Sequence, residues 1–541
     1  MHFAAAPLGA SFRWKLGLGL AVVAVGDWLL YQRGLAYGSW GLLALALLAA
    51  LLAGTPALRR SKPGLPAALA ACLFALALTW DPGPLAWTLF WLAAGMAALL
   101  ARTGRFDDGW RWAQRLFWQA LRAPFAPLLD MRRIAKVRAA GHGRRIGLRR
   151  AASLLTMPLL GGAVIVALFC AANPILAGAV SSLLSIDTSL VAQGGRAILW
   201  TIVFAMAWSL LRPGLLRHPL PLFEGRGELR LPGFSPASIT LSLVVFNAIF
   251  AVQNLLDAAY LWGTAALPPG MTLADYAHRG AYPLIATALL AALFVLIALR
   301  PGSETAGSPA IRRLVTLWIM QNIVLVASSI QRTADYIEAY SLTRLRIAAL
   351  AWMVLVAFGL ATICWRLLRN RSSAWLVNVN LAATALVLTG FCFVDLGTMA
   401  ARWNVRHARE VGGRGAALDL CYLNRMGGSA LLPLLELEQR RGLNPGFRAR
   451  VQAVRLDTQQ RQPVALGLID MRRQEQARTI AATLPRPDLG GGLRDCDGSV
   501  IAELPAEPPS PVPAPAPATA SAPTPSPAPP AQSPTQPAAP R

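Results

Sequence analysis

Long apolar runs constrain the fold of this chain more than any other feature. A transmembrane helix needs roughly 20 consecutive apolar residues, with about 17 to 25 as the usual range. Between residues 65 and 101 only the sequence DPGP separates two such runs, so the span count there depends on that break. The predicted spans, eleven in all, are residues 15–32, 38–55, 65–81, 84–101, 152–176, 195–212, 236–262, 282–300, 312–332, 345–368 and 375–396.

The composition indicates the same class of protein. Of the 541 residues, 55% are apolar and 14% are charged, whereas soluble domains carry roughly 25% charged residues. The mean hydropathy is +0.47. Because lipid offers no hydrogen-bond partners to an open strand, each spanning segment should be a helix. We therefore predict an all-α integral membrane protein with about 11 transmembrane helices.

The net charge of +25 does not indicate a nucleic-acid-binding protein. The basic residues punctuate the apolar runs and do not form a basic face on a soluble domain. The sequence also lacks a Walker A loop, HExxH, GxSxG and a paired CxxC, which weakens the common soluble-enzyme interpretations. We predict no nucleic-acid partner, no cofactor and no metal site.

The distribution of basic residues predicts the orientation. Arg13 and Lys15 precede an apolar run of about fifteen residues, and no small-x-small cleavage site follows, so we interpret it as a retained first span. With a cytoplasmic N-terminus, most basic residues that flank spans lie inside, as the positive-inside rule requires. The outer connections before residue 397 then contain only Arg33, Arg196, Arg279, Arg332, Arg344 and Arg346. We predict a multi-pass protein of the bacterial inner membrane with a periplasmic C-terminal region.

The predicted organisation has five parts. Residues 1–101 form membrane helices one to four, 102–151 a basic amphipathic cytoplasmic loop, 152–396 membrane helices five to eleven, 397–503 an extracytoplasmic helical region, and 504–541 a disordered tail rich in proline and alanine. The tail cannot bury a core and should act as an extended tether.

The loop at 102–150 places Trp110, Ala113, Leu116, Phe117 and Leu121 at helical spacing, with arginines elsewhere around the helix. This pattern is typical of an interfacial helix that contacts the bilayer and binds anionic lipid headgroups. Docking of a cytoplasmic protein partner is the alternative interpretation.

The six cysteines fall into two groups. Cys72, Cys170, Cys364 and Cys392 lie inside predicted spans, where small apolar packing explains them. Cys421 and Cys496 lie beyond residue 397. If that side is a periplasm, it permits oxidation, so a disulfide between them is possible. A free thiol at each position is the alternative.

Polar residues gather at the outer ends of spans seven, nine, ten and eleven. The candidate residues are Asn254, Asp257, Gln321, Asn322, Arg332, Asp335, Glu338, Arg344, Arg346 and Asp395. Ionisable and amide side chains within spans are costly and therefore indicate function by default. One interpretation is a water-filled polar cavity open to the outside, with Asp257 and the mid-span amides at its base. The other is a set of helix-end charges that pair locally, such as Asp335 with Arg332, together with amides that pin helices.

Several stretches resemble a known family. They are QNLLDAAYLWG, GMTLADYAHRGAYPL, YIEAYSLTRLRIAALAW and VRHAREVGG with the following LDLCYLNRMGGSALLPLLELE, and together they cover roughly residues 235–440. They resemble an uncharacterised bacterial polytopic membrane family known as domain of unknown function four-one-seven-three, which is related to a group numbered four-one-five-three. Ser341 stands where the family motif has glycine. The resemblance implies a membrane protein and transfers no catalytic residue.

Three hypotheses for the function follow. The first is transport of a small solute or ion through the outward-facing polar cavity. The second is a non-catalytic membrane scaffold or sensor component in envelope homeostasis, with a periplasmic or membrane protein partner. The third, a membrane enzyme acting on envelope substrates, has carboxylates for acid–base chemistry but no motif. We therefore do not predict an enzyme.

Overall fold

The computed structural model describes residues 8–34, 38–139, 188–216, 218–220, 235–260, 287, 290, 294, 307–369, 371–461, 465–485 and 496. All regular secondary structure within these residues is helical. Seven of the described helices are long and apolar enough to cross a membrane. The predicted all-α membrane class is therefore confirmed, and the exact number of spans stays a prediction. The predicted spans 152–176 and 282–300, the tail 504–541 and Cys170 lie outside the described residues, apart from isolated positions within 282–300.

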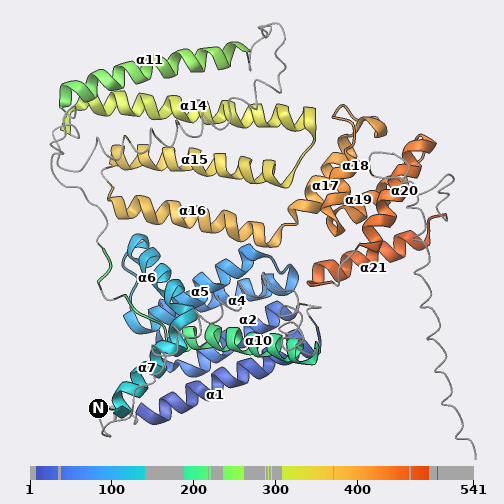
Figure 1. The fold of residues 1–541 in the computed structure, drawn as a ribbon. Coiled ribbons are helices and arrows are strands. Elements are labelled where there is room, and N and C mark those ends of the chain that lie inside the picture. Colours follow the sequence, from blue (N-terminus) through green and yellow to red (C-terminus); the bar gives the residue numbers. More distant parts are fainter. Residues whose placement is uncertain are drawn as a thin grey trace, which may run out of the picture.

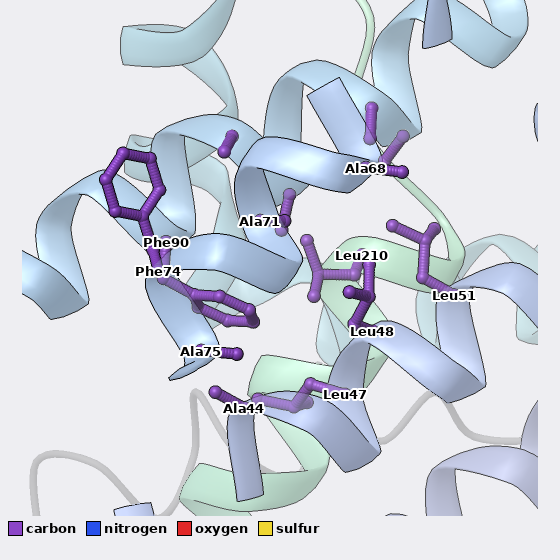
Figure 2. Packing of buried hydrophobic residues seen from close by; sticks show 14 of the residues in the cluster. Ala44, Leu47, Leu48, Leu51, Ala68, Ala71, Phe74, Ala75, Phe90 and Leu210 are labelled. Carbon is purple, nitrogen blue, oxygen red and sulfur yellow. The ribbon is translucent and has the colours of Figure 1, made fainter. Parts of the chain in front are cut away.

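The first part of the chain is a helical bundle, drawn in blue and green in Figure 1. Its helices are α1 (Leu8–Asp27, continued by the π-helical turn Trp28–Gln32), α2 (Ser39–Gly54), α3 (Pro56–Arg60), α4 (Gly64–Trp80), α5 (Pro84–Thr103), α6 (Gly109–Arg122), α7 (Ala126–Ala139) and α10 (Thr188–Leu211). Figure 2 shows its core, in which leucines of α2 interlock with alanines and Phe74 of α4. Small residues allow this close approach: a Cβ added at Gly41 would overlap the backbone of Thr79, a packing mode typical of membrane helices.

Four long helices form a second layer, in which they lie side by side (Figure 1). They are α11 (Pro236–Tyr260), α14 (Pro309–Tyr340), α15 (Arg344–Arg369) and α16 (Ser373–Phe393). Trp318 of α14 packs against Phe246 and Phe250 of α11 and against Phe294. Large apolar side chains of these helices remain exposed, Leu255 and Leu386 among them. In a helix that crosses a bilayer, such side chains face lipid.

The last part of the chain is a group of short helices at one end of the second layer (Figure 1). We call α17–α21 the tail unit; its helices are α17 (Leu396–His407), α18 (Leu420–Met426), α19 (Gly428–Glu438), α20 (Pro445–Gln460) and α21 (Leu468–Ala482). Leu434 and Leu437 of α19 are completely buried in its core. A disulfide joins Cys421 of α18 to Cys496, so the pairing suggested by the sequence is present in the structure.

The two ends of the molecule have different sets of charged contacts. At one end, which we call the basic face, Lys15 Nζ donates to the Leu211 carbonyl at 2.7 Å and an Arg102 nitrogen donates to the Pro213 carbonyl at 2.6 Å. At the other end, which we call the tail face, Arg196 pairs with Asp27 and the tail unit meets the membrane helices. Basic residues that the sequence predicts on one side of the membrane thus lie at the same end of the structure, where they bond carbonyl groups at the end of α10 and just beyond it.

Candidate functional site

The contact between α11 and α14 carries a line of amide side chains. On α11, Asn247, Asn254 and Asp257 share one helix face because they are spaced at seven and three residues. Asn247 Nδ2 donates to the Leu314 carbonyl at 3.1 Å, and Asn254 Nδ2 donates to the Gln321 carbonyl at 3.2 Å. The separation in sequence is 67 in both contacts, so the two helices run in the same direction. These bonds fix their register.

An ion pair between Asp257 and Arg332 lies at the tail-face end of this contact. The two side chains are 1% and 3% exposed, and Gln253 Nε2 adds a hydrogen bond of 2.9 Å to the Asp257 carboxylate. Burying two charges costs several kcal/mol per ion, which only close pairing and further hydrogen bonds offset. The interpretation of locally paired helix-end charges suggested Asp335 as a partner of Arg332. In the structure Arg332 pairs with Asp257 of α11, because it lies on the buried side of α14.

Three amide oxygens on α11 and α14 accept no hydrogen bond within the described part of the chain. They belong to Asn254, Gln321 and Asn322. Asn322 is fully buried, and its Nδ2 donates to the Trp318 carbonyl at 2.8 Å within the same helix. Buried polar atoms usually have hydrogen-bond partners. These three oxygens are therefore chemically able to accept a hydrogen bond from a donor or to bind a cation.

The turn between α14 and α15 is held by the tail unit. Asn404 of α17 makes two hydrogen bonds with the backbone of Leu342: its Oδ1 accepts from the amide at 2.6 Å, and its Nδ2 donates to the carbonyl at 2.9 Å. Arg346 Nη1 donates to the Tyr340 carbonyl at 2.8 Å, and its guanidinium lies 4.3 Å from the ring centre of Tyr336. Arg346 is therefore used locally to close the turn.

Arg344 and Asp395 contact the tail unit. Arg344 Nη2 donates to Ser429 Oγ at 2.9 Å, and Tyr422 Oη accepts from the Arg344 amide at 3.2 Å. Asp395 caps α17 by accepting from the Thr398 amide at 3.0 Å, and Arg473 of α21 pairs with its carboxylate at 2.7 Å.

Burial alone would raise the pKa of Asp395. The hydrogen bonds from Thr398 and the positive charges of Arg473 and Arg344 outweigh that effect and leave the pKa below its usual range. Asp395 therefore carries its negative charge at neutral pH, as an ion pair with Arg473 requires.

The remaining two candidates stand apart from these contacts. The Asp335 carboxylate accepts from Gln331 at 2.9 Å on the same helix, and Glu338 is exposed without an ion pair to any other described residue. The ten predicted residues thus occupy three places: the α11–α14 contact, the turn with its tail-unit contacts, and the exposed end of α14.

Sequence reasoning missed the tail-unit partners Asn404, Ser429 and Arg473. The stretches around Asn404 and Ser429 belong to the region of family resemblance, which was the only available signal. Among the described residues, no group of three or more His, Cys, Asp or Glu could hold a metal ion.

Comparison with known proteins gives one match. Residues 64–437 match the family described as Domain of unknown function (DUF4153). No curated protein and no solved structure matches. An uncharacterised family of the expected kind is therefore shown, and its number is that of the group related to domain four-one-seven-three. The match also begins at residue 64, in α4, whereas the resemblance began near residue 235, so it includes helices of the first bundle.

Proposed function

The chain belongs to the DUF4153 family of unknown function, and we propose that it is a non-catalytic membrane scaffold that fixes the tail unit to one face of its membrane helices. The observation that carries this proposal is the set of polar contacts that the α14–α15 turn, Arg344 of α15 and Asp395 between α16 and α17 make with the tail unit. We call the contacts of Asn404 with Leu342, Arg344 with Ser429, and Asp395 with Arg473 the latch.

The latch uses two of the ten polar candidate residues, Arg344 and Asp395. Arg344 and Asp395 are both engaged with partners more than 75 residues away in sequence, and Asn404 satisfies both backbone groups of Leu342. A typical intramolecular hydrogen bond contributes about 1 kcal/mol net, and one to a charged group about 2 kcal/mol. Three such contacts hold a small unit in one orientation, which suits the presentation of a surface to a partner protein.

We place the tail unit in the periplasm of a bacterium and the basic face in the cytoplasm. The positive-inside rule supports this orientation, because Lys15, Arg102 and Arg212 lie together at the opposite end from the tail unit. The Cys421–Cys496 disulfide supports it independently, since disulfides persist in oxidising compartments and are rare in the cytosol.

We also propose that α6 lies in the membrane interface on the basic face. Its Trp112 is buried against the bundle, whereas Trp110, Phe117 and Leu121 on another side are between 43% and 71% exposed. Arginines complete the helix surface, and Arg115 pairs with Asp107 at 2.7 Å. An exposed apolar side beside cationic residues fits a helix that contacts anionic lipid headgroups.

The scaffold proposal is tested by rescue of a deletion strain. The double variant Arg344→Gln/Arg473→Gln, which opens the latch, should fail to rescue the deletion phenotype although the protein remains in the membrane fraction. The matched control is Arg461→Gln, which removes an exposed ion pair with Asp457 at the C-terminal end of α20. It should rescue fully, because such pairs contribute at most about 1 kcal/mol. Full rescue by the latch variant would refute the proposal.

Transport of a small solute or ion is the second candidate. The buried amide oxygens of Asn254, Gln321 and Asn322 favour it, because they have no donor among the described residues. In the same rescue experiment, Asn322→Leu should abolish function if these oxygens bind a transported species and should preserve function if the protein is a scaffold. The two candidates therefore make opposite predictions for the latch variant and the amide variant.

A further inference from the structure

A cavity of about 630 Å³ lies on the tail face, between the tail unit and the end of α4. Residues at helical spacing on α17 form one wall, and residues at helical spacing on α21 form another; both helices are at the same end of the molecule in Figure 1. The cavity combines arginines with aromatic rings. The aromatic and cationic residues in its wall include Trp80, Arg402, Trp403, Arg406, His407 and Arg472.

The cavity carries an excess of positive charge. Arg473 also lines it, but its charge is offset by Asp395 at 2.7 Å. Arg402 lies 3.4 Å from Glu436, and both side chains are more than 40% exposed, so water screens that pair. Arg406 and Arg472 form no ion pair with a carboxylate in the described part of the chain. Two exposed guanidinium groups from two different helices therefore remain available to an anion.

The apolar part of the cavity is continuous with the membrane helices. Trp80 is the last residue of α4, and the guanidinium of Arg472 lies 4.9 Å from the centre of its ring. Met399, Leu432 and Ile469 add aliphatic surface. A ligand of this cavity would need an anionic group to contact the arginines. The rest of the ligand would lie against an apolar surface close to the bilayer.

We propose that this cavity binds a phosphate-bearing anion, contacted by Arg406 from α17 and by Arg472 from α21. A guanidinium group is planar and presents paired donors that match phosphate oxygens, and such charge-assisted bonds are stronger than neutral ones. The phosphate belongs either to a membrane lipid headgroup or to a soluble phosphate. The cavity shares Asp395 and Arg473 with the latch, but the two residues proposed to contact the anion, Arg406 and Arg472, form no part of the latch.

The test uses the full-length protein in a neutral detergent at low ionic strength. Inorganic phosphate is titrated by calorimetry, and phosphatidylglycerol is added in a separate native mass spectrometry experiment that counts bound lipids. Arg406→Gln and Arg472→Gln should each weaken binding by about tenfold, the equivalent of one charge-assisted contact. Arg478→Gln removes the same charge from the exposed side of α21 without lining the cavity, and should change the affinity by less than twofold.

The outcomes separate the two sources of phosphate. A soluble ligand is supported if inorganic phosphate binds saturably and both arginine variants lose this binding. A lipid headgroup is supported if phosphatidylglycerol binds, inorganic phosphate does not, and both variants lose the bound lipid. The proposal is overturned if neither probe binds saturably. It is overturned equally if Arg478→Gln weakens binding as much as the other two variants, because the effect would then be general attraction to a basic surface. Circular dichroism of each variant checks that the helices are intact.

Discussion

The buried pair of Arg332 and Asp257 combines two opposite energetic effects, the cost of burying each charge and the attraction between them. Each charge has lost its water, so each destabilises the fold if it stands alone, while the pair connects α11 to α14 at the tail face. Replacing one partner of a buried pair typically costs about 3–5 kcal/mol, whereas replacing both with apolar residues of similar volume is often neutral. The pair therefore specifies which helices meet more than it adds net stability.

This reasoning predicts a non-additive mutant cycle. Asp257→Leu and Arg332→Met should each lower the free energy of unfolding by about 3 kcal/mol or more, and the double variant should lose less than either single variant. Thermal unfolding in one detergent, followed by loss of helical signal, measures the three values. Asp335→Asn is the control on the same helix. It should cost less than about 1 kcal/mol because, among the described residues, its carboxylate accepts a side-chain hydrogen bond only from Gln331, one turn earlier. Additive losses would show that the two charges do not depend on each other.

The turn between α14 and α15 contains a residue with unusual backbone geometry. Ser341 has φ of 71° and ψ of 163°, a region essentially reserved for glycine because a Cβ there meets the backbone. Among the described residues, Ser341 is the only one other than glycine with positive φ. Asn404 and Arg346 hold the turn from both sides, so the surrounding contacts impose the strained conformation.

Glycine at position 341 should therefore stabilise the protein. We expect Ser341→Gly to raise the free energy of unfolding by about 1 kcal/mol, the lower end of the cost of such a residue. Ser341→Ala keeps the Cβ and should give no gain, which separates backbone strain from loss of the hydroxyl. Thermal midpoints of the three proteins in the same detergent test this expectation. A lower midpoint for Ser341→Gly would mean that the serine hydroxyl has a role that outweighs the strain.

The helices themselves were predictable from sequence, and their polar contacts were not. Apolar runs predicted 84–101 and 375–396, and the structure has helices at Pro84–Thr103 and Ser373–Phe393. The predicted ninth span, 312–332, lies within α14, which extends further at both ends, from Pro309 to Tyr340. The 32 residues of α14 measure about 48 Å, well beyond a hydrocarbon core of about 30 Å. Hydropathy detects only the part in lipid, so the polar end of the helix escaped detection.

The residues that contact the α14–α15 turn could not be predicted from the sequence. Asn404 contacts Leu342 across 62 residues, and Ser429 contacts Arg344 across 85. Those contacts depend on how the tail unit docks, which no local periodicity encodes. The sequence did place Arg344, Arg346 and Asp395 near one end of the membrane helices, because helix direction alternates from span to span. It did not identify their partners, because nearby acids were the only partners visible in the sequence.

At the scale of the whole molecule, the charges divide the protein into two faces. Helix α10 runs opposite to α1, because Arg196 meets Asp27 at the tail face while Leu211 meets Lys15 at the basic face. The same alternation continues through α14, α15 and α16, so the tail unit emerges at the end opposite to the basic residues (Figure 1). A fold of this kind can couple the tail unit to the basic face only through its helices.

The two faces predict a topology that labelling can measure. Glu338 is exposed at the tail-face end of α14, and Ser372 is exposed at the other end of α15, where it caps α16. In a variant whose other accessible cysteines are absent, a cysteine at position 338 should react with a membrane-impermeant maleimide from the periplasmic side of intact cells. A cysteine at position 372 should react only after the cells are permeabilised, because the basic face should lie in the cytoplasm. Labelling of both positions from one side would contradict the proposed topology, and labelling of position 372 alone in intact cells would invert it.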